Sequence, residues 1–398
     1  MNSRAQAPAE VPRVAELDGL RGFAILSVVL MHYFYNPDPH LKGPIHEIQR
    51  IFALGWSGVD LFFVLSGFLI GGILLEYRNS PCYFKPFYLR RIFRIFPIYY
   101  LWILLFIFFI HFGGPLLRTH THSGQLPELN FSIYRHFLFL QNLWDVDYTT
   151  LAIWWFSTTW SLAVEEQFYL VAPLLVRYLP QRLLPPLLGA IVVLAPVLRT
   201  LIRLHSGSDV NWAAYRLMPC RADALAIGML LAFAWRTDSI RKIILSKPIR
   251  LYIVFLLLLM GMAVIWWRYP NPNDALTQSV GYSLIALFYA VLLIISIGLR
   301  SGPIAKFMRW GVLREFGRIS YCLYLVHLVV GYFCFGFFTR STIHFSDWRS
   351  GSLGLLSLAV AYGLSRMSWT YFEHPLVQRG HRYKYIAENE GSPRQVLA

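Results

Sequence analysis

Ten apolar segments, each long enough to cross a lipid bilayer, place the strongest limit on the fold of this chain. They cover residues 17–36, 56–77, 92–112, 154–176, 183–204, 219–235, 249–267, 276–298, 319–338 and 351–372. About 20 apolar residues suffice for a helix to span the hydrocarbon layer. Only 14% of the residues are charged, against roughly 25% in soluble domains. The sequence therefore predicts an all-α integral membrane protein of about ten transmembrane helices bundled around a polar cavity.

The charge distribution predicts how these helices are oriented. The net charge is +15, but the Lys and Arg residues lie between apolar runs, which argues against nucleic-acid binding. With the N-terminus inside, the stretches between the apolar segments on the inner side hold more than twice as many Lys and Arg residues as those on the outer side. Arg199 and Arg203 are counted with the outer side. Both termini are therefore expected in the cytoplasm. The expected division is a cytoplasmic tail (1–16), a ten-helix domain (17–376) and a second cytoplasmic tail (377–398).

The first apolar segment contains two ionisable residues, Arg21 and His32. They are eleven positions apart, which places both on one face of a helix and about 16 Å apart along its axis. Ionisable groups inside a bilayer are costly and usually face a protein interior or a wet cavity. The sequence therefore predicts a line of polar chemistry that follows one face of this helix.

Further polar residues interrupt the other apolar segments. At the outer ends we expect a cluster with His32 that consists of Asp60, Ser161, Arg221 and Asp223, with Glu165 nearer the middle. An ion pair between Asp60 and Arg221 would lower the cost of burying both. At the inner end of the third segment, Arg91 and Arg94 lie about 60° apart on a helix, so both can hold one anion.

Several of these strings resemble motifs of the membrane-bound acyltransferase 3 family, the integral-membrane O-acetyltransferases of bacterial glycans. The similarity extends from Leu17 to about Pro375. The matching strings are Arg21 with His32, Gly58-Val59-Asp60 with Ser66-Gly67, Arg91 with Arg94 and Pro97, Trp160-Ser161 with Glu165, Arg221 with Asp223, and Ser320-Tyr321 with Tyr324 and His327. Glu166 lies outside the family pattern.

The resemblance implies transfer of an acyl group, commonly acetyl from acetyl-CoA, to a hydroxyl of a glycan or another cell-envelope or secondary-metabolite acceptor. It implies a multi-pass protein of the bacterial inner membrane. Acyl-CoA is then a co-substrate, and neither a tightly bound cofactor nor a metal is expected. The four cysteines likewise lack the spacing of a metal site. Some family members carry a fused periplasmic esterase-like domain, and a single-module enzyme is expected here.

The predicted catalytic residues are His32, Glu165 and Asp60. His32 is either a general base or an acyl-accepting nucleophile. Glu165 either acts in the site, by orienting His32 or binding the acceptor, or is a structural anchor. Asp60 either orients His32 or pairs with Arg221.

Arg21, Arg91 and Arg94 are predicted to bind the acyl-CoA donor, although Arg91 and Arg94 would also serve as simple inner-side anchors. Further cavity candidates are Ser66, Trp160, Ser161, Arg221, Asp223, Ser320, Tyr324 and His327. For the last three, a polar contact between helices is an equal alternative.

A secondary transporter or channel for a polar or anionic solute is the main alternative function, because it too would carry intramembrane charges. Many such folds are built from two repeated halves, and the sequence shows no internal repeat. Binding of CoA would separate the two functions. A membrane scaffold or sensor would leave the polar face of the first segment without a purpose.

Overall fold

The computed structural model describes residues 14–36, 42–112, 133–143, 150–206 and 212–385. These residues are mostly helical and form no β-strand. The predicted all-α fold is therefore confirmed.

Eight helical spans are long and apolar enough to cross a membrane in the described part of the chain. Their principal helices are α1 (Ala15–Phe34), α3 (Gly58–Glu76), α4 (Phe84–Phe112), α9 (Leu184–Ser206), α11 (Met218–Arg236), α13 (Pro248–Arg268), α14 (Tyr282–Gly298) and α17 (Ser320–Thr339). Each coincides with one of the predicted segments.

The two remaining predicted segments also form long helices, α8 (Trp160–Tyr178) and α18 (Trp348–Ser368). Both contain at least 19 residues, but neither is among the eight apolar spans. In α8 the neighbouring Glu165 and Glu166 lower the mean hydropathy. The estimate of about ten transmembrane helices is therefore approximate.

Shorter helices connect the long ones. They are α2 (Pro44–Ile51), α6 (Ile133–Phe137), α7 (Thr150–Phe156), α10 (Trp212–Arg216), α12 (Asp238–Leu245), α15 (Pro303–Met308), α16 (Gly311–Arg318) and α19 (His374–His381), with the single turns η1 (Gly55–Ser57), η2 (Ser157–Thr159), η3 (Gln181–Leu183), η4 (Thr277–Gly281) and η5 (Trp369–Glu373). The predicted domain boundary at residue 376 falls inside α19. Residues 1–13 and 386–398, which make up most of the two predicted tails, lie outside the described residues.

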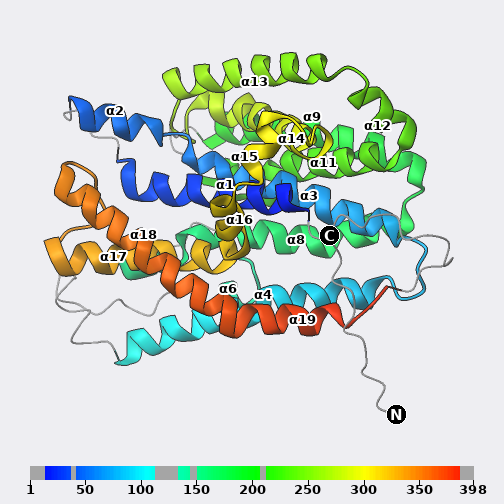
Figure 1. The fold of residues 1–398 in the computed structure, drawn as a ribbon. Coiled ribbons are helices and arrows are strands. Elements are labelled where there is room, and N and C mark those ends of the chain that lie inside the picture. The colour runs from blue at the N-terminus through cyan, green and yellow to red at the C-terminus, as the bar shows by residue number, and fades with distance from the viewer. Residues whose placement is uncertain (1–13, 37–41, 113–132, 144–149, 207–211, 386–398) are drawn as a thin grey trace, which may run out of the picture.

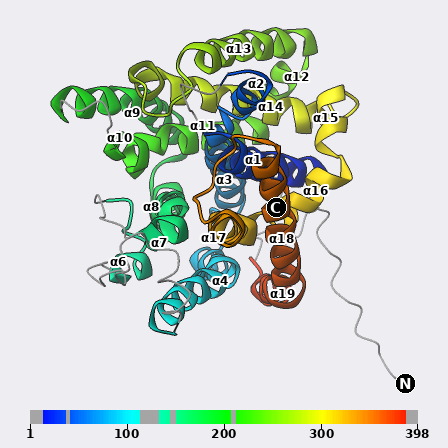
Figure 2. The same ribbon diagram turned by 90° about the vertical axis from the view of Figure 1, so that its left-hand side faces the viewer.

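The long helices lie side by side, with α1 and α3 in the middle of the bundle and α13 at its edge (Figures 1 and 2). In the apolar 18-residue stretch of the span that contains α3, 78% of the residues are buried inside the protein, against 11% in the corresponding stretch of α13. The apolar side chains of α13 are exposed on the surface, as at Leu256, Met260 and Val264. A membrane protein exposes such a surface to lipid. The interior of the protein, where polar residues would be shielded from lipid, therefore lies around α1 and α3.

Two glycines allow α3 and α11 to approach closely. A Cβ atom on Gly67 would collide with the Leu225 carbonyl and would lie 3.0 Å from the Cα of Gly228. A Cβ atom on Gly228 would lie 2.8 Å from the Phe68 nitrogen. Close helix crossings in membranes use such small residues because they let the two backbones touch. This crossing fixes how α3 presents its polar residues to α11.

Candidate functional site

A histidine pair joins α1 to α17 in the bundle. Nδ1 of His32 lies 3.0 Å from Nε2 of His327, and the ring centroids are 5.0 Å apart. His327 is completely buried, whereas His32 is half-buried. The hydroxyl of Tyr33 donates a hydrogen bond to the backbone carbonyl of His327 at 2.6 Å. Two successive residues of α1 therefore contact the same residue of α17.

A second polar contact joins α17 to the beginning of α8. The hydroxyls of Tyr324 and Ser161 lie 2.7 Å apart. The Tyr324 hydroxyl also contacts the Thr158 carbonyl at 3.1 Å. Tyr324 precedes His327 by one helical turn, and their rings are 6.0 Å apart. Ser320, in contrast, donates a hydrogen bond to the Gly317 carbonyl, at 2.9 Å.

The predicted ion pair between Asp60 and Arg221 is confirmed. Asp60 Oδ1 lies 2.6 Å from Arg221 Nη2, and both side chains are 1% exposed. The Arg221 guanidinium is surrounded by aromatic rings; these belong to Phe63, Trp160, Tyr215 and Tyr282. Tyr282 is nearest, at 4.0 Å from the ring centroid, where cation–π attraction is strong. The structure thus links Asp60 to Arg221, while the ring of His32 contacts His327.

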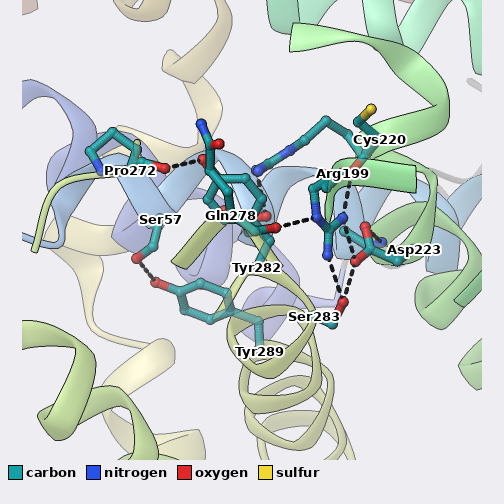
Figure 3. A network of polar contacts seen from close by, with 12 residues as sticks. Ser57, Arg199, Cys220, Asp223, Pro272, Gln278, Tyr282, Ser283 and Tyr289 are labelled. Carbon is teal, nitrogen blue, oxygen red and sulfur yellow. Dashed lines mark hydrogen bonds and ion pairs between the residues drawn. The ribbon is translucent and has the colours of Figure 1, made fainter. Parts of the chain in front are cut away.

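Asp223 belongs to a separate buried network, shown in Figure 3. Its Oδ2 lies 3.0 Å from Nη1 of Arg199 and accepts a hydrogen bond from Ser283 at 2.6 Å. Arg199 also donates to the carbonyls of Cys220 and Gln278, at 2.5 and 2.6 Å. These contacts tie α9, α11 and α14 together, and they explain why a charged residue, Asp223, can be buried there.

The sequence-based assignment of Arg199 and Arg203 to an outer segment is wrong, because both residues lie within the span of α9. Arg199 lies within α9 and is completely buried. The apolar stretch of α9 gives way to polar residues here, so the sequence resembles the end of a span. The acid that neutralises Arg199 is Asp223, on a different helix. Sequence spacing gives no signal for a pair of this kind.

Three arginines gather at the other end of α1. Arg21 lies 3.7 Å from Asp18, and the charges of Arg91 and Arg94 also act on it. The half-buried Arg91 guanidinium lies 5.4 Å from the centroid of the Phe87 ring and 5.8 Å from that of Tyr169. Among the described residues, no carboxylate lies within ion-pair distance of Arg91 or Arg94. This arrangement leaves positive charge available to an anion.

Glu165, on α8, contacts Ser66 of α3 and lies close to these arginines. Its two carboxylate oxygens accept hydrogen bonds from Ser66 at 2.8 Å and from Tyr169 at 3.0 Å. Arg21 and Arg94 are near enough to interact electrostatically with it. Sequence reasoning placed Ser66 only among the cavity candidates and did not select Tyr169. The four-residue spacing between Glu165 and Tyr169, which puts them on one helix face, could have identified the pair.

The structure thus sorts the predicted site residues into three groups. His32 and His327 form one, with Tyr324 and Ser161 close by, whereas Trp160 lies beside Arg221. Arg21, Arg91, Arg94, Glu165 and Ser66 form a second group. Asp60, Arg221 and Asp223 form ion pairs that join α3, α9 and α11. In the described ranges, no group of three His, Cys, Asp or Glu residues could hold a metal ion.

The fold and these groups define a polytopic membrane protein whose polar groups lie inside the helical bundle. A family model described as an acyltransferase domain matches residues 14–367, so the chain belongs to this family of acyltransferases. The resemblance stated from the motifs is therefore confirmed.

Curated proteins similar to the chain include O-acetyltransferases by name. It is 26% identical to O-acetyltransferase OatA of Staphylococcus aureus (strain NCTC 8325 / PS 47), over 96% of this chain and 60% of that protein. It is 26% identical to peptidoglycan O-acetyltransferase OatA of Listeria monocytogenes, over 92% of this chain and 56% of that protein. The chain thus spans less than two thirds of these relatives. No solved structure matches it.

Proposed function

We propose that this protein transfers an acetyl group from acetyl-CoA to a hydroxyl of a cell-envelope glycan. The names of the relatives support acetyl as the group and peptidoglycan as the acceptor class. The observation that carries the proposal is the half-buried His32 inside an apolar bundle, with its Nδ1 held by His327. An imidazole held at one nitrogen and accessible from one side is suited to general-base catalysis.

In the proposed reaction, His32 acts as a general base. Its Nε2 takes the proton of the acceptor hydroxyl while the hydroxyl oxygen attacks the thioester carbonyl carbon. The tetrahedral intermediate then collapses, the carbon–sulfur bond breaks, and the CoA thiolate takes the proton back from His32. The products are an O-acetyl ester and CoA, and no external oxidant, reductant or metal is needed.

The arginine group is proposed to bind the donor. Arg21, Arg91 and Arg94 place three positive charges close together with Asp18 as the only carboxylate at ion-pair distance among the described residues. Arginine suits phosphate because its planar guanidinium binds two oxygens at once. Arg21 and His32 are about 16 Å apart along α1. The flexible pantetheine arm of CoA would bridge this distance, with its phosphates at the arginines and its thioester at His32.

Glu165 is proposed to fix the position of α8 against α3 beside the donor-binding arginines, through its hydrogen bonds with Ser66 and Tyr169. Its nearness to Arg21 supports this role, since a carboxylate fixed there limits how the arginines can move. Asp60 is proposed to support the site by neutralising Arg221, whose aromatic surroundings include Trp160. Trp160 and Ser161 are proposed to lie where the acceptor glycan approaches His32.

Acetyl transfer by the purified protein tests this function. The protein is reconstituted into liposomes with radiolabelled acetyl-CoA and soluble peptidoglycan fragments. His32→Ala is expected to lower the rate by roughly 100-fold or more, because a general base contributes roughly 100- to 10,000-fold. Ser357→Ala serves as a control, since it removes a buried hydrogen bond within α18 (Ser357 Oγ to the Leu353 carbonyl, 2.8 Å). Activity of His32→Ala above a tenth of wild type would contradict the assignment. Solute uptake without a new ester would favour the transporter.

A further inference from the structure

We infer that His327 is a positioning residue that sets the tautomer of His32 and keeps the Nε2 of His32 free of a proton. The inference rests on the proposed function, because it matters only if His32 accepts a proton from the acceptor. It follows from two contacts in series and from the burial of His327, which together fix the direction of each hydrogen bond.

The first contact is within α17. Nδ1 of His327 lies 2.9 Å from the backbone carbonyl oxygen of Leu323. A carbonyl oxygen can only accept a hydrogen bond. Nδ1 of His327 must therefore carry a proton and act as the donor.

The second step concerns the charge of His327. Its side chain is completely buried, and in the described part of the chain no carboxylate forms an ion pair with it. Burying an unpaired charge is strongly unfavourable. The ring is therefore neutral. Since Nδ1 carries the single proton, Nε2 presents a lone pair.

The second contact, the third step of the argument, sets the state of His32. Its Nδ1 lies 3.0 Å from the Nε2 of His327. Because the His327 nitrogen is an acceptor, the Nδ1 of His32 donates to it. The backbone carbonyl of Val28, one turn earlier on α1, is a further acceptor for the His32 ring. A neutral His32 then has its lone pair on Nε2, the nitrogen farther from His327. The Tyr33 hydroxyl donates a hydrogen bond to the backbone carbonyl of His327 at 2.6 Å. Helices α1 and α17 are therefore joined by a second hydrogen bond beside the contact between the two histidines.

This arrangement prepares His32 for the proposed reaction. In the other tautomer, Nε2 would carry the proton and could not take one from an acceptor hydroxyl. Once Nε2 is protonated, the Nδ1–H of the imidazolium still donates to His327, so the charged intermediate keeps a hydrogen bond. In serine proteases the buried aspartate orients the catalytic histidine in the same sense. Here a neutral histidine would supply the acceptor.

Two substitutions at His327 separate the acceptor from the packing. In His327→Gln the amide oxygen can accept from Nδ1 of His32. In His327→Leu the side chain is similar in size but accepts nothing. His327→Gln is expected to keep kcat within about fivefold of wild type. His327→Leu is expected to lower kcat by about 30-fold or more with an unchanged KM for acetyl-CoA, because the reactive tautomer loses the acceptor that His327 supplies. Equal kcat values for the two variants would overturn the inference.

A spectroscopic measurement tests the tautomer without reference to activity. Nitrogen-15 NMR of histidine-labelled protein in lipid, with the His32 signals assigned by their loss in His32→Ala, reports which nitrogen is protonated. Wild type and His327→Gln are expected to show a protonated Nδ1 in His32, and His327→Leu a mixture. A protonated Nε2 in wild-type His32 would overturn the inference. A wild-type protein with the expected tautomer but no acetyl transfer would contradict only the proposed function. Ser357→Ala again controls for the loss of a buried hydrogen bond.

Discussion

The arginines of this protein divide into those that the fold neutralises and those that it does not. Arg199 and Arg221 are fully buried, and each is paired with an aspartate at 3.0 Å or less. An unpaired charge at such a position would be very costly, so these pairs are part of the structure. Arg91 and Arg94 are half-buried and have no carboxylate at ion-pair distance among the described residues. Charges in this second state are suited to binding a ligand.

Replacement of Arg91 and Arg94 together by alanine should therefore weaken donor binding more than folding. A charge-assisted hydrogen bond is worth roughly 1.5–3 kcal/mol, so the dissociation constant for acetyl-CoA should rise by at least about tenfold. Isothermal titration calorimetry on the purified protein measures it. Arg241→Ala is the control, because Arg241 forms an exposed ion pair with Asp238 on α12. An unchanged dissociation constant in the double variant would return the two arginines to the role of membrane anchors.

At the residue scale, sequence reasoning found the contacts that periodicity or local charge balance can reveal. The spacing of Arg21 and His32 identified the polar face of α1, and the need to neutralise Arg221 suggested Asp60. The bond between His32 and His327 could not be derived this way, because 295 positions separate the two residues. The pairing of Arg199 with Asp223 was missed because it depends on how α9 packs against α11. Only the packed structure defines such contacts.

At the scale of the helix, the crossing of α3 and α11 holds the Asp60–Arg221 pair together, because each helix contributes one partner. The glycines at this crossing allow backbone contact that any larger side chain would prevent. Membrane helices have little hydrophobic reason to associate, so such close packing contributes much of the stability.

Substitution of Gly228 by valine should consequently destabilise the protein. Its side chain would meet the backbone of α3 at Val64 and Phe68, which cannot move aside as a flexible side chain can. We expect a lower thermal midpoint and poor recovery of monodisperse protein in detergent, measured by fluorescence-detected size exclusion after heating. The control is Gly189→Ala in α9, where no described atom outside the local helix backbone lies within 4 Å of the new Cβ. Alanine should stabilise that helix slightly, by about 0.5–1 kcal/mol. Equal midpoints for Gly228→Val and wild type would show that the crossing tolerates separation.

The helices themselves were more predictable than their contacts. All ten segments identified from hydropathy form long helices in the structure, because a continuous apolar run has few alternatives in a bilayer. The boundaries were less accurate. The last predicted segment ends at residue 372, but the chain continues as a helix through η5 and α19 to His381. The polar composition of this extension conceals it from a hydropathy criterion.

On the scale of the whole molecule, α1 connects the two groups of polar residues. Arg21 lies near its beginning with Arg91 and Arg94, and His32 lies near its end with His327. The helix passes through the middle of the bundle (Figure 2). The two groups are therefore about 16 Å apart along one buried helix. A donor held at one group and an acceptor held at the other would approach from opposite faces of the membrane.

This geometry predicts that the proposed acetyl transfer runs across the membrane. The charge bias of the sequence predicts that the Arg21 end of α1 faces the cytoplasm, where acetyl-CoA is made, so the acceptor would reach His32 from the opposite side. Sealed vesicles of known orientation test this with radiolabelled acetyl-CoA and a membrane-impermeant glycan. The glycan should become labelled when it is on the opposite side of the membrane from acetyl-CoA, with the donor at the cytoplasmic face, and labelling should disappear in His32→Ala vesicles. Vesicles that label the glycan only when both substrates share a compartment would exclude the across-membrane arrangement. The arginine group and His32 would then have to be reached from the same face.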